Sequence, residues 1–234
     1  DSLEDAEEVH IAMVGKYTGL SDSYLSVIKA LQHSSFKVNR KLVIDWIESA
    51  ELDEETAGTD PEAHAAAWEL LKAADGILVP GGFGIRGIEG KIKAAEYARE
   101  SGTPYLGVCL GLQVATIEFC RNVLGLERAN STEFDEDTPN PAVVFMPEIS
   151  KTHMGGTMPL GTKPTPFLVD DCKMRRLYDG VDHVDERHRH RYEVNPDLIG
   201  QIESAGLKYV GKDETGERCE IMELEGHPYF VGTQ

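Results

Sequence analysis

The sequence is short of positive charge and of long apolar runs. Of its 234 residues, 23 are Lys or Arg and 41 are Asp or Glu, so the formal net charge is −18. This balance argues against nucleic acid and anionic membranes as partners, because clustered cations bind phosphate-rich surfaces. A soluble, acidic surface is the simpler interpretation. No apolar run is long enough to span a bilayer.

Cysteine is also scarce, with Cys109, Cys120, Cys172 and Cys219 as the four positions. None forms a C-x-x-C pair, and the spacing suits neither a zinc site nor a disulfide framework, so we expect no metal site. Free thiols are typical of a reducing compartment, and we expect a cytoplasmic protein. For the last three thiols we expect only packing or surface roles.

Strand and helix patterns alternate in the first half of the sequence. Apolar runs predict strands at 10–17, 41–49, 76–80 and 103–108, and helical patterns occupy 22–35, 60–74, 88–100 and 110–124. Repeated units of this length predict an α/β fold with a mostly parallel sheet covered by helices on both faces.

The second half is less regular. Residues 135–161 are rich in Pro, Gly, Thr and acids, which predicts long loops. We expect short strands at 142–145, 167–169 and 207–210, and a hairpin of 221–226 with 229–234. No repeat or linker divides the chain, so we expect one domain over 1–234.

Cys109 lies in the pattern G-x-C-x-G, between a predicted strand and a predicted helix. This is the context of a nucleophile elbow, in which a sharp strand-to-helix turn exposes the nucleophile. The helix start is expected to lower the thiol pKa, and the Leu110 N–H can bind an oxyanion. A buried structural cysteine is the alternative, but the flanking elements favour the nucleophile.

The glycine-rich stretch PGGFGIRG contains G-x-G-x-x-G at Gly82, Gly84 and Gly87. A dinucleotide site is not favoured, because the next strand ends in a cysteine rather than an acid and the loop follows the third strand. We interpret the stretch as a loop that faces Cys109, with Gly82 as a second oxyanion donor.

Charged residues gather at 186–195, ERHRHRYEVN. A solvated surface run is the plain interpretation. The functional alternative is an Arg that pairs with a substrate carboxylate through its guanidinium fork. Glu133, in ANSTEF, is a carboxylate that can bind an ammonium group.

The motifs PGGFG, GVCLGLQ, NSTEF, MGGTM and ERHRHRYEVNP occur together in this order. The set resembles the class I glutamine amidotransferase domain of CTP synthases, a flavodoxin-like fold, from about residue 9 to 234. The resemblance implies that Cys109 attacks the side-chain amide of L-glutamine and forms a glutamyl thioester, with Gly82 and Leu110 as oxyanion donors. The implied glutamine-binding residues are Gly82, Phe83, Leu110, Gln113, Glu133 and Arg191.

The resemblance implies no cofactor in this domain. In the longer enzymes an N-terminal synthetase domain, absent from this sequence, uses ATP, UTP and Mg²⁺ and aminates UTP to CTP with the released ammonia. GTP activates these enzymes, and residues 154–158 lie in a region associated with that response. Leu112 stands where Met is common, a conservative change. Pro159 replaces a common Arg, which removes a cation there.

The catalytic base of the resembling family is a His followed by Pro and Glu, just beyond V-G-x-Q. The sequence stops at Gln234, and His227-Pro228 is followed by Tyr229 instead of Glu. The first residues form neither a signal nor a transit peptide, and no Met begins the chain. We therefore expect a fragment. The alternative to a glutaminase is a catalytically silent module for binding or assembly.

Overall fold

The computed structural model describes residues 6–16, 21–146 and 160–234. The MGGTM segment and Pro159 lie outside the described residues. The strands are β1 Glu8–Gly15, β2 Lys41–Glu48, β3 Gly76–Val79, β4 Tyr105–Val108, β5 Asn130–Ser131, β6 Pro141–Phe145, β7 Leu160–Pro166, β8 His183–Arg189, β9 Tyr192–Val194, β10 Leu207–Lys212, β11 Cys219–Leu224 and β12 Phe230–Thr233. The α-helices are α1 Leu25–Lys37, α2 Glu54–Thr59, α3 Pro61–Ala73, α4 Ile88–Ser101, α5 Leu110–Asn122, α6 Lys173–Leu177 and α7 Pro196–Ser204.

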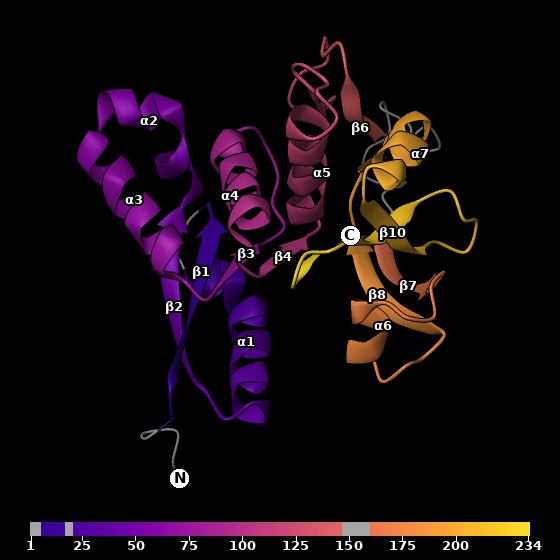
Figure 1. Cartoon of the computed structure of the whole chain (residues 1–234), viewed down its shortest axis with the longest axis horizontal. Coiled ribbons are helices and arrows are strands. Elements are labelled where there is room, and N and C mark those ends of the chain that lie inside the picture. The colour runs from indigo at the N-terminus through magenta and orange to yellow at the C-terminus, as the bar shows by residue number, and fades with distance from the viewer. Residues whose placement is uncertain (1–5, 17–20, 147–159) are drawn as a thin grey trace.

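A seven-stranded sheet in the order β10-β11-β12-β4-β3-β1-β2 runs through the molecule. All neighbours are parallel except β11, which is antiparallel to β10 and β12. The order β2-β1-β3-β4 is that of a flavodoxin-like fold. Helices α3, α4 and α5 stand in a row on one side, and α1 lies on the other (Figure 1). The predicted open, mostly parallel sheet with helices on both faces is therefore confirmed.

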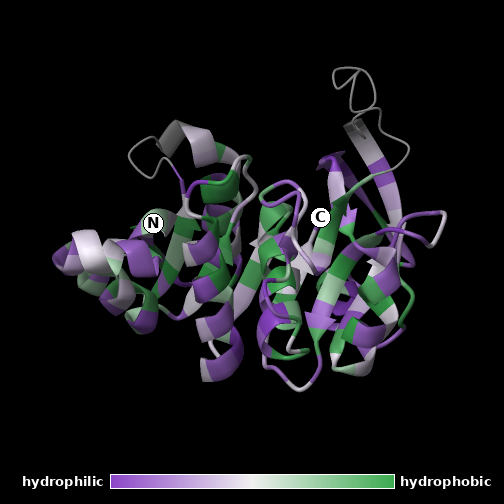
Figure 2. Ribbon diagram, turned by 90° about the horizontal axis from the view of Figure 1, so that it is seen from above, coloured by the Kyte–Doolittle hydropathy of each residue, from purple (hydrophilic) through white to green (hydrophobic). Residues whose placement is uncertain are grey.

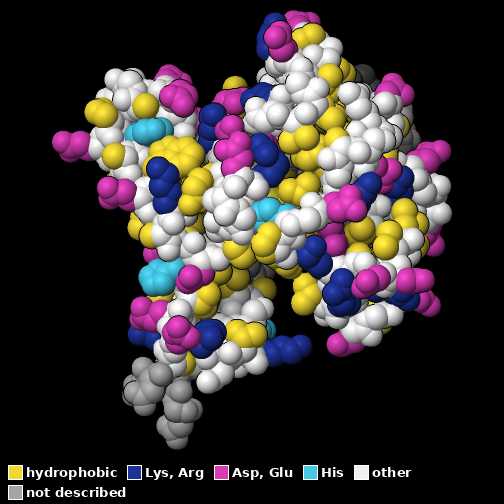
Figure 3. Space-filling view, in the orientation of Figure 1, with side chains coloured by type: hydrophobic (Ala, Val, Ile, Leu, Met, Phe, Trp, Pro, Cys, Tyr) yellow, Lys and Arg dark blue, Asp and Glu magenta, His cyan; other side chains and the backbone are white. Residues whose placement is uncertain are grey.

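Most of the helices carry both hydrophobic and hydrophilic residues, whereas α5 is buried over most of its length. Figure 2 shows hydrophobic and hydrophilic residues mixed along most of them. Helix α5 differs, because its residues 110–120 are all buried between the sheet, α4 and the second half of the chain. No helix in the described ranges is long and apolar enough to cross a membrane. On the face drawn in Figure 3, acidic and basic side chains are interspersed.

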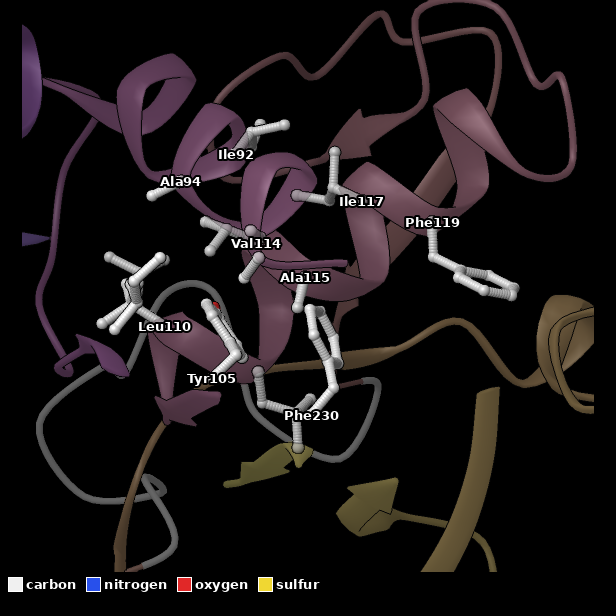
Figure 4. Close-up of a cluster of buried hydrophobic side chains, with 14 of the residues drawn as sticks. Ile92, Ala94, Tyr105, Leu110, Val114, Ala115, Ile117, Phe119 and Phe230 are labelled. Atoms are coloured by element: carbon white, nitrogen blue, oxygen red, sulfur yellow. The ribbon is translucent and has the colours of Figure 1, made fainter. Parts of the chain in front are cut away.

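The core beneath α4 and α5 fixes the middle of the sheet (Figure 4). Tyr105 of β4 stacks on Phe230 of β12 with ring centroids 4.5 Å apart. The fully buried Tyr105 hydroxyl donates to the Gly111 carbonyl at 2.8 Å. Strand β4, strand β12 and the first turn of α5 are thus held together at one point.

A buried ion pair joins α4 to α5. The Glu118 side chain is fully buried and accepts hydrogen bonds from Arg99 Nε at 3.0 Å and Nη2 at 2.8 Å. Asn122 Nδ2 also donates to Glu118, at 3.0 Å. This charge is paired and hydrogen-bonded, which is the condition under which a carboxylate is tolerated in a core.

Two small sheets complete the second half, β5-β6-β9 and β7-β8. The predicted strand at 167–169 is wrong, since β7 ends at Pro166 and Phe167 forms only an isolated bridge with Gly211. The predicted hairpin is confirmed by the antiparallel pair β11-β12. Strand β8 was not expected, because its charged residues gave the pattern of a surface run. Helix α2 was also missed, and the helix expected from Asp22 begins at Leu25 after a 3₁₀ turn.

Candidate active site

Cys109 occupies a strained corner between β4 and α5. Its φ is 53° and its ψ −103°, a left-handed φ that costs energy for a residue with a side chain. A Cβ on Gly107 would lie 2.5 Å from the Gly111 carbonyl carbon, and one on Gly111 would lie 2.2 Å from the Val79 oxygen. Only glycine fits at these two places, so the predicted strand–turn–helix geometry is confirmed.

The surroundings of the partly buried thiol are mainly desolvating. Burial raises the Cys109 pKa to about 11, and the N–H of Leu110, which hydrogen-bonds the sulfur, opposes that rise. The charges of Glu133 and Glu193 raise the pKa further. The expectation of a lowered thiol pKa is therefore wrong for this state. The helix N-terminus acts in the expected direction, but desolvation outweighs it.

The thiol opens onto a small cavity between the two halves of the chain. Its walls are the β3–α4 loop, the elbow, α5, the turn after β5 and the β8–β9 turn. The lining residues are Gly82, Phe83, Cys109, Gln113, Glu133, His190, Arg191 and Tyr192. All the predicted site residues except Leu110 line this cavity. The Leu110 side chain is buried in the core, and its backbone contacts the thiol instead.

Opposite charges meet in this cavity. Burial raises the pKa of Glu133, while an N–H from Gly84 and the charges of Lys16 and Arg191 lower it. The cavity thus holds a carboxylate and a guanidinium within electrostatic reach of each other. Such a pair can bind the ammonium and carboxylate groups of a free amino acid at the same time.

The side-chain amide of Gln113 is hydrogen-bonded to other residues of the chain. Gln113 Nε2 donates to the Tyr192 carbonyl at 3.1 Å and lies 3.5 Å from Gln234 Oε1. The Gln234 amide nitrogen in turn lies 3.7 Å from Cys109 Sγ. Gln113 therefore connects the elbow helix to the wall formed by β9.

Phe83 is 56% exposed, and the Arg189 guanidinium lies 5.8 Å from its ring centroid.

Two buried lysines near the site were not predicted. Lys16 Nζ donates to the carbonyls of Phe83 at 2.9 Å and Gly84 at 2.6 Å, so it fixes the glycine-rich loop from the end of β1. Lys91 is fully buried, and its Nζ lies 3.7 Å from where a Cβ on Gly82 would be. Burial lowers the Lys91 pKa to about 7. The sequence G-K-Y at the end of the first predicted strand could have pointed to Lys16 as a residue near the site. Nothing in the local sequence distinguishes Lys91 from a surface lysine.

His227 has a structural position, as its sequence context indicated. Its Nδ1 accepts the Tyr229 N–H at 3.2 Å, and its Nε2 therefore donates to the Ala98 carbonyl at 2.9 Å. Both ring nitrogens are engaged away from the Cys109 cavity. The expectation that the other three thiols serve packing is confirmed, since Cys120, Cys172 and Cys219 are all buried and unpaired.

The profile of the class I glutamine amidotransferases matches residues 20–234. The chain therefore belongs to the class I glutamine amidotransferase family. Within the family its similarity is to CTP synthases: it is 57% identical over 240 residues to CTP synthase 2 of Saccharomyces cerevisiae, covering 100% of this chain and 42% of that protein. To CTP synthase 2 of Xenopus laevis it is 57% identical over 224 residues, or 96% of this chain and 39% of the relative. The chain thus spans about two fifths of the length of these curated relatives.

Solved structures of glutamine amidotransferases are also similar to this chain. The glutaminase domain of Trypanosoma brucei CTPS with bound acivicin superposes with a TM-score of 0.86 at 38% identity, covering 97% of this chain and 84% of that one. A glutamine amido transferase from Methylobacillus flagellatus has a TM-score of 0.51 at 12% identity, covering 98% of this chain and 70% of that one, and shows the fold alone.

Proposed function

We propose that this domain hydrolyses L-glutamine to glutamate and ammonia, with Cys109 as the nucleophile. The observation that carries the proposal is the shared cavity, in which the strained Cys109 lies together with Glu133 and Arg191. A nucleophile and two groups of opposite charge are what the recognition and attack of a free amino acid require. The family of the chain and its similarity to a CTPS glutaminase domain support the same reaction.

In the proposed complex the charged end of glutamine lies between the two charged side chains. Arg191 binds the α-carboxylate, for which a guanidinium is suited, and Glu133 binds the α-ammonium. Phe83 and Gln113 flank the substrate as lining residues of the cavity. The side-chain amide then reaches toward Cys109 at the elbow.

The proposed chemistry has two steps. The Cys109 sulfur bonds to the amide carbon of glutamine, and the N–H groups of Gly82 and Leu110 stabilise the resulting oxyanion. The C–N bond breaks, the nitrogen takes the proton that the Cys109 thiol gives up, and ammonia departs, which leaves a glutamyl thioester on Cys109. Water then adds to the thioester carbonyl, glutamate leaves, and the thiol is restored.

In the longer protein we propose that the ammonia serves to aminate UTP to CTP. The curated relatives are CTP synthases more than twice as long as this chain. ATP, UTP, Mg²⁺ and the activator GTP belong to that longer enzyme, and a synthetase domain is the proposed partner of this one.

One observation favours a second candidate function, glutamine binding without hydrolysis. Among the hydrogen bonds between described residues, the side-chain donor at Cys109 Sγ is the Gln234 amide rather than an imidazole. His190, the imidazole found in the cavity lining among the described residues, is engaged with Glu193 at 2.5 Å. Without a base at the sulfur, the thiol of a domain with this arrangement would stay protonated.

Labelling with an electrophilic glutamine analogue tests the proposal. Intact-mass spectrometry should show a single adduct at Cys109 that excess glutamine prevents, and Cys109→Ala should show none. Cys120→Ala is the matched control, because that thiol is buried in α5, the helix that follows Cys109, and its removal should leave the adduct unchanged. An unmodified Cys109 would refute the nucleophile assignment. An adduct without ammonia release from glutamine would favour the binding function.

A further inference from the structure

A second cluster of polar side chains lies behind the wall of the Cys109 cavity. His188, His190 and Glu220 each offer a ligand atom, and these atoms lie within 4.8 Å of one another. The three residues are only 4%, 3% and 5% exposed, respectively. They converge from separate elements, since His188 is in β8, His190 follows it, and Glu220 is in β11 of the main sheet.

These buried side chains carry polar atoms without hydrogen-bond partners. Within the described part of the chain, no hydrogen bond reaches either ring nitrogen of His188, Nδ1 of His190 or Oε2 of Glu220. His188 Nδ1 and Glu220 Oε2 lie 3.3 Å apart, within ion-pair range, so the carboxylate already faces the imidazole. Three buried side chains whose ligand atoms face one another with incomplete hydrogen bonding can share a bound cation.

We propose that His188, His190 and Glu220 bind a Zn²⁺ ion. Two imidazoles and one carboxylate form a recurrent zinc ligand set that leaves the fourth position to water. Mg²⁺ and Ca²⁺ prefer ligand sets made of oxygen, so the two imidazoles select against them. The cysteine spacing predicted no metal site, but this ligand set needs no thiol.

The surroundings of His190 match those of a metal-bound histidine. Its Nε2 pairs with Glu193 Oε1 at 2.5 Å, which leaves Nδ1 as the nitrogen available to a metal. A carboxylate on the second ring nitrogen is the usual outer partner of a zinc-bound histidine, since it fixes the tautomer and the ring orientation. Glu193 is therefore a positioning residue in this proposal.

A cavity supplies the open side of the site. It has a volume of about 220 Å³, and its lining includes the three ligands together with Lys163, Asp213 and Arg218. This space gives a water molecule access to the fourth coordination position. Bound Zn²⁺ would connect β8 of the two-stranded sheet to β11 of the main sheet, so it would stabilise the packing of these two parts. The proposal does not involve Cys109 and goes beyond glutamine hydrolysis.

Zinc titration of the chelator-treated protein tests this site. The experiment is done in the Cys109→Ala background, so that the reactive thiol cannot be the ligand, with isothermal titration calorimetry and a chromophoric competitor. We expect a single saturable Zn²⁺ site. His188→Ala and Glu220→Gln should each weaken binding more than tenfold, and Glu193→Gln should weaken it about 10- to 100-fold. His183→Ala is the matched control, an exposed histidine of the same strand, and should have no effect.

X-ray absorption of the zinc-loaded protein with Cys109 intact provides a readout that does not depend on variant folding. We expect imidazole and oxygen scattering without sulfur. The proposal is overturned if zinc does not bind saturably, if binding survives His188→Ala and Glu220→Gln unchanged, or if sulfur appears among the ligands. Each of these results leaves the glutaminase proposal standing, because that proposal depends on the labelling of Cys109.

Discussion

The protonation of the Cys109 thiol can be measured by its rate of alkylation as a function of pH. Because burial raises the pKa to about 11, only about one thiol in a thousand is ionised at pH 8. An ordinary cysteine with a pKa of about 8.5 is about one-quarter ionised at that pH. Since the thiolate is the nucleophile, Cys109 of the free domain should react about 200-fold more slowly than a free thiol.

The assay is the pseudo-first-order reaction with iodoacetamide between pH 6.5 and 9.5, followed by mass spectrometry of the Cys109 peptide. The rate should rise about tenfold for each pH unit over this range, with no plateau. N-acetylcysteine in the same buffers calibrates the intrinsic reactivity at each pH.

Glu133→Gln provides the matched variant for this experiment. The Glu133 charge raises the Cys109 pKa, so its removal should lower that pKa and speed alkylation. The same variant should bind glutamine more weakly if Glu133 holds the ammonium group. A rate that levels off below pH 9, or a Glu133→Gln protein that reacts more slowly, would show that desolvation does not control this thiol.

Two further predictions concern stability, measured by urea unfolding. Arg99→Ala should lower the free energy of unfolding by about 3–5 kcal/mol, because it leaves the carboxylate of Glu118 buried without its cation; a loss below 1 kcal/mol would contradict a buried pair. Gly111→Ala should lower it by about 3 kcal/mol or more, since the new Cβ would lie 2.2 Å from a backbone oxygen of β3. Gly58→Ala has no atom within 4 Å of its Cβ and lies in a helix, so it should be neutral or stabilising by up to about 1 kcal/mol. Equal losses for the two glycines would refute the packing argument.

Much of the first half of the fold was predictable because its signals are local. Apolar runs and helical periodicity gave the strands and helices of the parallel sheet to within a few residues. Strand β8 was missed because charge dominated the interpretation of its sequence. The alternation was present, since Val184 and His188 point inward while Asp185 and Arg187 are exposed. Whether a histidine can be buried depends on distant partners such as Glu220, which the local sequence does not reveal.

The candidate site, too, was predictable where its signals are local and not where they depend on distant residues. The G-x-C-x-G spacing, with a predicted strand before it and a predicted helix after it, identified the corner at Cys109. The contact that excludes a side chain at Gly107 is local, with Gly111, whereas the one at Gly111 is with Val79 of the neighbouring strand β3. Glu133 and Arg191 were singled out only as residue types able to bind an amino acid, and the resemblance supplied their roles. The pKa direction of Cys109 was wrong because desolvation depends on the elements that enclose the thiol. Lys91 was missed for the same reason, since its burial follows from the packing of α4.

The position of β12 in the sheet has a consequence for the order of folding. This strand is formed by residues 230–233 and follows the other described strands in the sequence, yet it lies between β11 and β4. While a chain emerges from the ribosome N-terminus first, β4 therefore has an unpaired edge until β12 arrives. The backbone N–H of Cys109 donates a hydrogen bond to the Thr233 carbonyl at 2.6 Å, so this hydrogen bond also forms only once β12 is present. The corner that holds the thiol therefore reaches its final backbone contacts only after residues 230–233 have been synthesised and β12 has joined the sheet.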